Sequence, residues 1–177
     1  MDIHVFNNIF SKEEREKLIF DVQPLLQDGK YISAKEFGGD GVYQEGFEWF
    51  KITNPTLHLH SSFTWAHDRI IEVVKDVLGL DLRVQRSWIN LSDGRNIKTE
   101  WLNHLYQYQG FDNSEYSMVY FIKTFPFFSN GTLFKNEGCV KAKQNSLIIF
   151  PSHLDHSTPG SIFRVKRYTM AFDLSNK

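Results

Sequence analysis

The sequence contains almost no cysteine and no long run of apolar residues. Cys139 is the only cysteine among 177 residues, so no disulfide can form within the chain and no cluster of thiolates can bind zinc. No segment approaches the roughly 20 apolar residues of a membrane-spanning helix. The opening residues, "MDIHVFNNIF", lack the basic and then apolar pattern of a secretion signal. We therefore expect a cytoplasmic protein that does not associate with membranes.

An excess of charge of either sign is also missing. The 20 basic and 21 acidic residues give a formal net charge of −1 with neutral histidines, so no overall field attracts nucleic acid or an anionic lipid surface. Aromatic residues, in contrast, are plentiful: they make up 15% of the chain, with 16 phenylalanines. This composition favours a β-rich fold with bulky side chains in its interior.

Two segments of the first half show the periodicity of amphipathic helices. Ser11 and Glu14 have the spacing of a capping box, and they precede a helical stripe formed by Leu18, Val22, Leu25 and Leu26. This pattern predicts a helix that ends near Gly29. A second helical stripe is formed by Phe63, Ile70, Val74 and Val77. It predicts a helix over residues 62–78, which Gly79 ends.

After residue 80 the pattern changes to short β-branched and aromatic runs separated by turn residues. These runs are "LRVQRSWINLS", "WLNHLYQY", "YSMVYFIKTF", "GTLF", "NSLIIF" and "RVKRYTMAFDL". Since strands and helices do not alternate, the pattern predicts a mainly β fold with N-terminal helices, of the jelly-roll or barrel type. We expect a single domain over 1–177, with a helical support region over 1–80 and a jelly-roll core over 81–177.

Three polar residues in this second half follow an informative order. His104 lies on an early predicted strand, His156 follows a late one within "FPSHLDHSTPG", and Arg167 lies on the last. The histidine-containing segment is either a polar turn or a metal site at the end of a strand. Arg167 either faces the interior or belongs to an exposed basic edge strand. His58 and His60, which share one side of a predicted strand, are a further histidine pair, whose alternative role is an amphipathic strand.

These residues carry a resemblance to the iron(II)- and 2-oxoglutarate-dependent dioxygenases. The sequence is similar to the small prolyl-hydroxylase-like members of bacteria and phages. The family's N-terminal strand and helix are resembled by "VFNNIFSKEEREKLI", and two of its core strands by "SWIN" and "SMVYFI". Its C-terminal segment, which contains the second iron histidine and the arginine, is resembled by "LIIFPSHLDHSTPGSIFRVKRYTMAFDL". The resemblance implies the double-stranded β-helix (jelly roll, cupin-like) fold, with Fe(II) as cofactor and 2-oxoglutarate and dioxygen as co-substrates.

The resemblance also implies roles for individual residues. His104 and His156 match the family's iron ligands, and Arg167 matches the arginine that binds the far carboxylate of 2-oxoglutarate. Thr169 stands where a small hydroxyl residue assists the arginine. Tyr120, on the strand after the first metal motif, offers a phenol to the same co-substrate. His153 is then a residue of the loop.

One position departs from the family's pattern. The expected His-x-Asp motif reads His104-Leu105-Tyr106, and a neutral phenol is a poor iron(II) ligand because its pKa is near ~10. Three alternatives remain: Asp112 from the following loop completes the iron site, the third position holds water or an anion, or the metal site has been lost.

The sequence therefore predicts an iron(II)- and 2-oxoglutarate-dependent hydroxylase. Its expected substrate is a C–H bond of a peptide side chain or a small molecule. The rival hypothesis, favoured by Tyr106, is a catalytically inactive jelly-roll binding module without its iron site. A third is a cupin-like barrel that binds another metal through His58 and His60.

Overall fold

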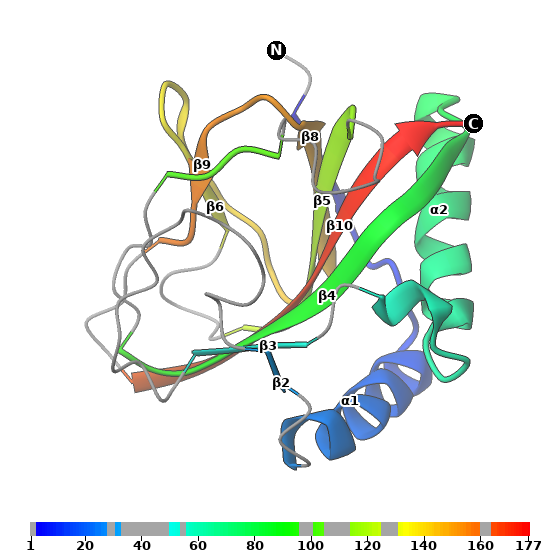
Figure 1. Cartoon of the computed structure of the whole chain (residues 1–177), viewed down its shortest axis with the longest axis vertical. Coiled ribbons are helices and arrows are strands. Elements are labelled where there is room, and N and C mark those ends of the chain that lie inside the picture. Colours follow the sequence, from blue (N-terminus) through cyan, green and yellow to red (C-terminus); the bar gives the residue numbers. More distant parts are fainter. Residues whose placement is uncertain are drawn as a thin grey trace.

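In the computed structural model, two antiparallel β-sheets face each other and two helices cover one of them (Figure 1). The structure describes residues 3–27, 31–32, 50–53, 56–95, 101–104, 114–124, 131–159 and 164–177. Within these residues the major sheet has seven strands, in the order β1 (His4–Asn7), β8 (Ser146–Pro151), β5 (Tyr116–Lys123), β10 (Arg164–Asn176), β4 (Leu82–Arg95), β3 (Phe50–Thr53) and β2 (Tyr31–Ile32). The minor sheet has three, in the order β7 (Gly138–Val140), β6 (Thr132–Phe134) and β9 (His156–Ser157).

The two predicted helices are confirmed. Helix α1 spans Lys12–Gln27 and begins with the expected capping box, in which the backbone N–H of Ser11 donates to Glu14 and the N–H of Glu14 donates to the Ser11 hydroxyl. Helix α2 spans Thr64–Leu78 and ends at Gly79, whose φ of 70° is the left-handed conformation that glycine adopts without strain. In the described ranges neither helix is long and apolar enough to cross a membrane.

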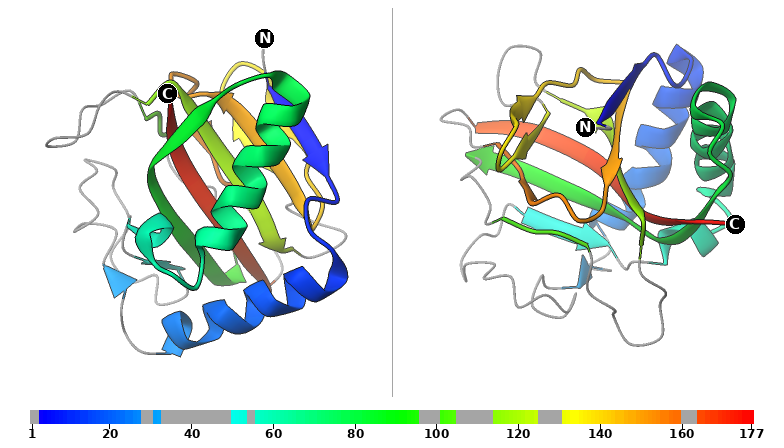
Figure 2. Two further views of the ribbon diagram at one scale, coloured as in Figure 1. Left: turned by 90° about the vertical axis from the view of Figure 1, so that its right-hand side faces the viewer. Right: turned by 90° about the horizontal axis from the view of Figure 1, so that it is seen from above.

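The major sheet has two different faces. Both helices pack on its outer face, as Figure 2 shows. Alternate residues of the strands point to this face because successive side chains of a strand lie on opposite sides. The buried cluster between helices and sheet includes Leu18, Val22, Ile70, Val74, Ile89, Met118, Tyr120, Leu147, Met170 and Phe172.

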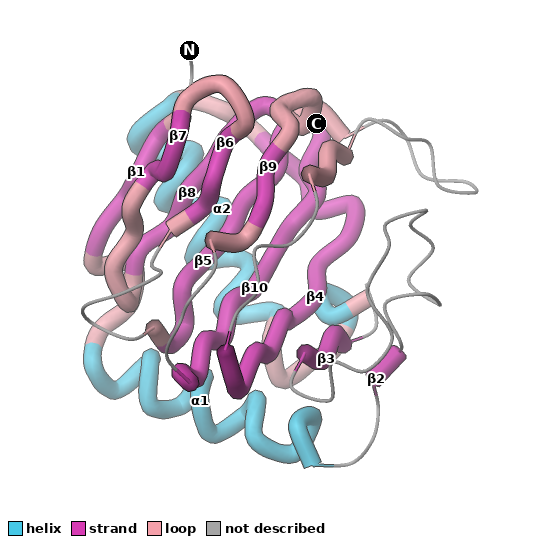
Figure 3. The backbone as a smooth tube through the Cα atoms, turned by 90° about the vertical axis from the view of Figure 1, so that its left-hand side faces the viewer, coloured by secondary structure: helices cyan, strands magenta, loops and turns pink. Residues whose placement is uncertain are grey.

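The inner face of the major sheet is turned toward the minor sheet (Figure 3). A second, smaller buried cluster fills part of this space, made by Phe121, Phe134, Ala142, Ile148 and Phe150. Other inward positions of β10 and β4 carry polar side chains, among them Arg167, Asp173 and Arg86. Charged side chains are thus buried on the face that is turned toward the minor sheet.

Three sequence-based details are wrong. Val77 is 62% exposed and does not pack with the rest of the predicted stripe. Leu57–Leu59 forms a 3-10 helix, η1, so His58 and His60 do not share the face of a strand. In its described part, Trp101–His104, the segment "WLNHLYQY" makes a single bridge, from Leu102 to His156, and no regular strand.

The start of β6 requires a glycine, which gives a stability prediction. Gly131 has a φ of +122°, and a Cβ at this position would lie 2.1 Å from the carbonyl oxygen of Val140. Gly131→Ala should therefore lower the free energy of unfolding by about 3 kcal/mol or more. Gly138→Ala, in the same hairpin, is the matched control, because its φ is also positive but nothing lies within 4 Å of the added Cβ. It should cost about 1 kcal/mol. Equal losses in urea unfolding would contradict the steric explanation.

Candidate metal centre

His104 and His156 come from distant parts of the chain, and backbone hydrogen bonds join the segments that carry them. The N–H of Leu102 donates to the carbonyl of His156 at 2.9 Å, and the N–H of His156 donates to the carbonyl of Leu102 at 2.8 Å. The N–H of His104 also donates to Ser152, just after β8, at 2.9 Å. These bonds fix the segment Trp101–His104 against the end of β8 and the start of β9.

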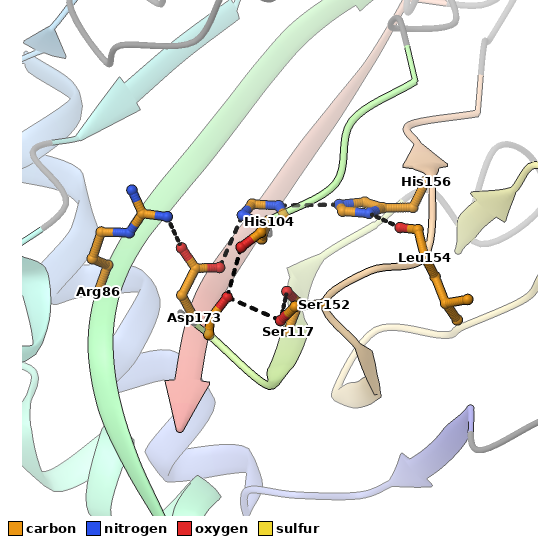
Figure 4. A network of polar contacts seen from close by, with 8 residues as sticks. Arg86, His104, Ser117, Ser152, Leu154, His156 and Asp173 are labelled. Atoms are coloured by element: carbon orange, nitrogen blue, oxygen red, sulfur yellow. Dashed lines mark hydrogen bonds and ion pairs between the residues drawn. The ribbon is translucent and has the colours of Figure 1, made fainter. Parts of the chain in front are cut away.

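The two imidazoles lie close together in this frame. Their Nε2 atoms are 3.3 Å apart, and the rings stack with centroids 5.0 Å apart and planes inclined by 14° (Figure 4). Aromatic side chains surround the pair: Trp88 stacks with His104 at 5.8 Å, and Phe150 contacts His156 edge to face at 4.8 Å. These aromatic rings shield the pair from water, so charge interactions there are stronger than in bulk water.

The partners of the other ring nitrogens determine which atoms carry protons. Nδ1 of His156 lies 3.0 Å from the carbonyl oxygen of Leu154, and Nδ1 of His104 lies 2.9 Å from Oδ1 of Asp173. A carbonyl and a carboxylate only accept hydrogen bonds, so each Nδ1 must be the protonated nitrogen of its ring. In the neutral rings both Nε2 atoms then carry lone pairs that point at each other. A metal ion bound by both Nε2 atoms satisfies this arrangement, as does a proton that one Nε2 donates to the other.

The environment of His156 keeps that residue ready to act as a ligand. Burial, together with the neighbouring His104, lowers the pKa of His156 to about 4. At neutral pH the imidazole is therefore uncharged, which is the form that coordinates metals.

The spacing of the two Nε2 atoms fits a shared metal ion. Two nitrogens bound about 2.1 Å from one ion at an angle of about 100° lie about 3.2 Å apart, and the observed distance is 3.3 Å. Among the residues that the structure describes, no set of three or more His, Cys, Asp or Glu side chains converges on one point. Asp112 and Tyr106, the two candidates for the third position, lie outside the described residues.

Asp173 and Arg86 are polar residues of this site that the sequence analysis missed. Asp173 is 1% exposed and forms an ion pair with Arg86, its partner on β4 (Figure 4). Burial alone would raise the pKa of Asp173, but the nearby His104 and Arg86 lower it below its ordinary value. The signal was present in the sequence, because Asp173 is six residues after Arg167 and alternation places both on one face of β10.

Arg167 is buried on the same inner face. It is 6% exposed and lies on β10 between β5 and β4, so the alternative of an exposed basic edge strand is wrong. Its guanidinium donates to the hydroxyl of Thr158 at 3.4 Å and to the carbonyl of Gly131 at 3.3 Å. Thr169, also buried, shares its face.

The charge of Arg167 is not neutralised by the described residues. None of the carboxylates whose side chains the structure describes pairs with its guanidinium, and its buried Nε has no hydrogen-bond partner among these residues. Burial lowers the pKa of Arg167 to about 10, so it is still protonated at neutral pH. A buried cation without a counter-ion is costly, and this position therefore suits an anionic ligand.

The structure does not bring Tyr120 to this site. Its side chain lies on the outer, helix-covered face of β5, where the ring packs edge to face on Phe10 and the hydroxyl donates to Asn145 at 3.0 Å. Burial raises the pKa of this phenol well above its ordinary value. Its sequence-based assignment failed because the face of the strand was not fixed by the sequence: Phe121, its neighbour, is the residue that points inward.

This placement gives a prediction that distinguishes a structural role of Tyr120 from the sequence-based role in binding 2-oxoglutarate. Tyr120→Phe should lower the free energy of unfolding by about 1 kcal/mol, since one buried hydrogen bond is lost. The affinity for 2-oxoglutarate, measured by calorimetric titration, should stay at the wild-type value. A clear loss of affinity in a folded Tyr120→Phe protein would contradict the observed placement.

His153 and Asp155, which precede His156 in the segment "FPSHLDHSTPG", do not contact the imidazole of His104. His153 is exposed in the turn after β8. The carboxylate of Asp155 pairs with Lys135 at 3.1 Å and accepts a hydrogen bond from Asn103 at 2.9 Å. Of the two histidines in "FPSHLDHSTPG", only His156 points to His104.

Comparisons with known proteins show what this fold is. No model of a known protein family matches the sequence, and neither does any curated protein sequence. Solved structures do match. HygX from Streptomyces hygroscopicus, solved with nickel and 2-oxoglutarate bound, superposes with a TM-score of 0.64 over 99% of this chain and 83% of its own, at 14% identity.

Two prolyl hydroxylases are similar over the same length. The enzyme from Trichoplax adhaerens, in complex with a hypoxia inducible factor peptide, gives a TM-score of 0.69 at 12% identity, covering 98% of this chain and 83% of its own. The viral collagen prolyl hydroxylase from Paramecium Bursaria Chlorella virus-1, in complex with 2-oxoglutarate, gives 0.65 at 10% identity, covering 98% and 96%. The predicted fold class is therefore confirmed: the chain has the double-stranded β-helix of these oxygenases.

Proposed function

We propose that the chain is an iron(II)- and 2-oxoglutarate-dependent oxygenase that hydroxylates a C–H bond. The observation that carries the proposal is the pair of Nε2 atoms of His104 and His156, which face each other at 3.3 Å with both Nδ1 atoms engaged elsewhere. The resemblance of the fold to structures solved with 2-oxoglutarate supports the same reaction class.

His104 and His156 are the residues that would hold the metal. Iron(II) bound by two imidazoles retains open positions for a chelating 2-oxoacid and for dioxygen, and it supplies the oxidising chemistry. Asp112 is the proposed source of a third ligand, because the segment that contains it directly follows His104 in the chain. Water or an anion at that position is the alternative.

Arg167 and Thr169 would hold the co-substrate. A guanidinium offers paired donors to a carboxylate, and Arg167 is a buried cation for which the described residues provide no counter-ion. Thr158, two residues after His156, already contacts Arg167. This contact connects the segment of the metal ligand with the residue that would bind the far carboxylate.

The proposed substrate is a peptide side chain or a small molecule. The matched structures include both kinds of complex, since HygX was also solved with hygromycin B and the Trichoplax adhaerens enzyme with a peptide. We propose a cytoplasmic location for the protein, because a single cysteine, Cys139, suits a reducing compartment.

An anaerobic titration tests this function. Iron(II) and 2-oxoglutarate should each bind in a 1:1 ratio, and together they should produce the visible charge-transfer band of the chelate. Admission of oxygen should then convert 2-oxoglutarate to succinate and carbon dioxide, with ascorbate as the reductant that takes the second oxygen atom to water in place of the substrate. Folded protein that gives neither a band nor metal binding would contradict the proposal and favour the jelly-roll binding module.

A further inference from the structure

Arg86, Asp173 and His104 form a continuous polar row that begins on β4 and ends at the metal centre (Figure 4). Arg86 and Asp173 are paired residues of β4 and β10. The carboxylate of Asp173 is almost completely buried, and it contacts Arg86 with one oxygen and Nδ1 of His104 with the other. Both of its oxygens are therefore directed at specific groups.

The two candidate ligands differ in how their rings are held. The Nδ1 atom of His156 faces the carbonyl of Leu154, which belongs to the same turn. For His104 the partner of Nδ1 among the described residues is Asp173, 69 positions along the chain on another strand. The segment of His104 is fixed by backbone bonds, but these bonds leave the rotation of the imidazole free.

We infer that Asp173, itself held by Arg86, is the positioning residue for His104. The carboxylate accepts the proton of Nδ1, which fixes the ring orientation and leaves the lone pair on Nε2, the atom that faces His156. Arg86 provides the counter-charge, because an unpaired carboxylate at this depth would be unstable. The inference rests on the proposed function and adds two residues, Asp173 and Arg86, to its site.

The geometry separates this role from that of a metal ligand. Asp173 contacts the Nδ1 edge of the imidazole, whereas the metal would bind at Nε2 on the opposite edge. With the ring as it stands, one ion cannot contact both Nε2 and this carboxylate. The carboxylate of Asp173 therefore contacts His104 and is not itself one of the metal ligands.

The test uses the full-length chain and two readouts, neither of which is turnover. In metal-free protein with 15N-labelled histidine, long-range 1H–15N correlation spectra should show that Nδ1 of His104 carries a proton. In Asp173→Leu the proton should no longer be confined to Nδ1, whereas the spectrum of His156 should be unchanged because its acceptor is Leu154. A wild-type His104 without a proton on Nδ1 would overturn the inference, and this measurement needs no variant to fold.

Cobalt(II) titration is the second readout, because cobalt(II) binds such ligand sets with an affinity comparable to or higher than that of iron(II). Asp173→Leu should weaken cobalt(II) binding by about ten- to 100-fold. Asp173→Asn, which retains an oxygen that can accept from Nδ1, should recover part of this loss. The matched control is Asp155→Asn: it removes a carboxylate next to His156 that contacts Lys135 and Asn103, and cobalt(II) affinity should stay close to the wild-type value.

The failure of the inference is distinguishable from that of the proposed function. If wild-type protein binds cobalt(II) and Asp173→Leu binds it equally well with an unchanged His104 spectrum, the positioning role is wrong and the function stands. If wild-type protein binds no divalent metal, the proposed function is wrong, and the spectra alone decide whether Asp173 orients His104.

Discussion

His156→Ala should abolish iron binding, with an affinity loss of more than about 100-fold, and with it all conversion of 2-oxoglutarate. The substitution removes one of the two imidazoles whose Nε2 atoms face each other. Mutation of a residue that only contacts a metal ligand typically lowers metal affinity ten- to 100-fold, and loss of the ligand itself should lower it further. The hydrogen bonds between residue 156 and Leu102 involve only the backbone. They do not depend on the imidazole, so the fold should be retained. Metal content after anaerobic reconstitution, measured together with circular dichroism, checks both expectations.

His153→Ala is the matched control for this experiment. It removes an imidazole from the same turn, three positions earlier in the chain, but one that is exposed. Its iron affinity and turnover should equal those of the wild-type protein. Equal iron contents in His153→Ala and His156→Ala would show that the metal binds elsewhere.

The second large effect is expected at Arg167. Arg167→Met should raise the dissociation constant of 2-oxoglutarate by about 100-fold or more, because a charge-assisted pair of hydrogen bonds to the carboxylate is lost. Iron affinity should be unchanged. Calorimetric titration of the metal-loaded protein measures the first quantity, and metal content measures the second.

Arg167→Met should also be at least as stable as the wild-type protein when 2-oxoglutarate is absent. The folded-state pKa of Arg167, about 10, lies below its ordinary value. Folding therefore disfavours the charged form, and this cost is fully present at all pH values below about 10. Arg69→Met, an exposed substitution on α2, is the control and should change neither stability nor affinity. An unchanged 2-oxoglutarate affinity in Arg167→Met would contradict the proposed carboxylate site.

The helices and most strands could be predicted because their signals are local. The capping box of Ser11 and Glu14 and the glycine at position 79 act within one helical turn, and both have the predicted contacts or conformation. Strands β4, β5, β6, β8 and β10 fall on the predicted apolar runs. The very short strands β7 and β9 were not predicted, because Gly138–Val140 and His156–Ser157 contain no run of β-branched or aromatic residues.

The site was only partly predictable, because it depends on which face of each strand is inward. In β10 the polar residues Arg167 and Thr169 alternate with apolar residues of the outer face, which distinguishes the two faces of the strand. The same alternation places Asp173 on the face of Arg167. For β5 both Tyr120 and Phe121 are aromatic, so the sequence does not show which of them points inward. The segment of His104 is positioned by backbone bonds to Ser152 and His156, which leave no periodic signal in the sequence.

The most direct test of the account is a crystal structure of the protein with iron(II) and 2-oxoglutarate, prepared without oxygen. The anomalous scattering of iron should give a single peak between the Nε2 atoms of His104 and His156, with the far carboxylate of 2-oxoglutarate on the guanidinium of Arg167. A peak at another place, or none while both imidazoles keep their observed positions, would contradict the proposal that this fold houses an oxygenase.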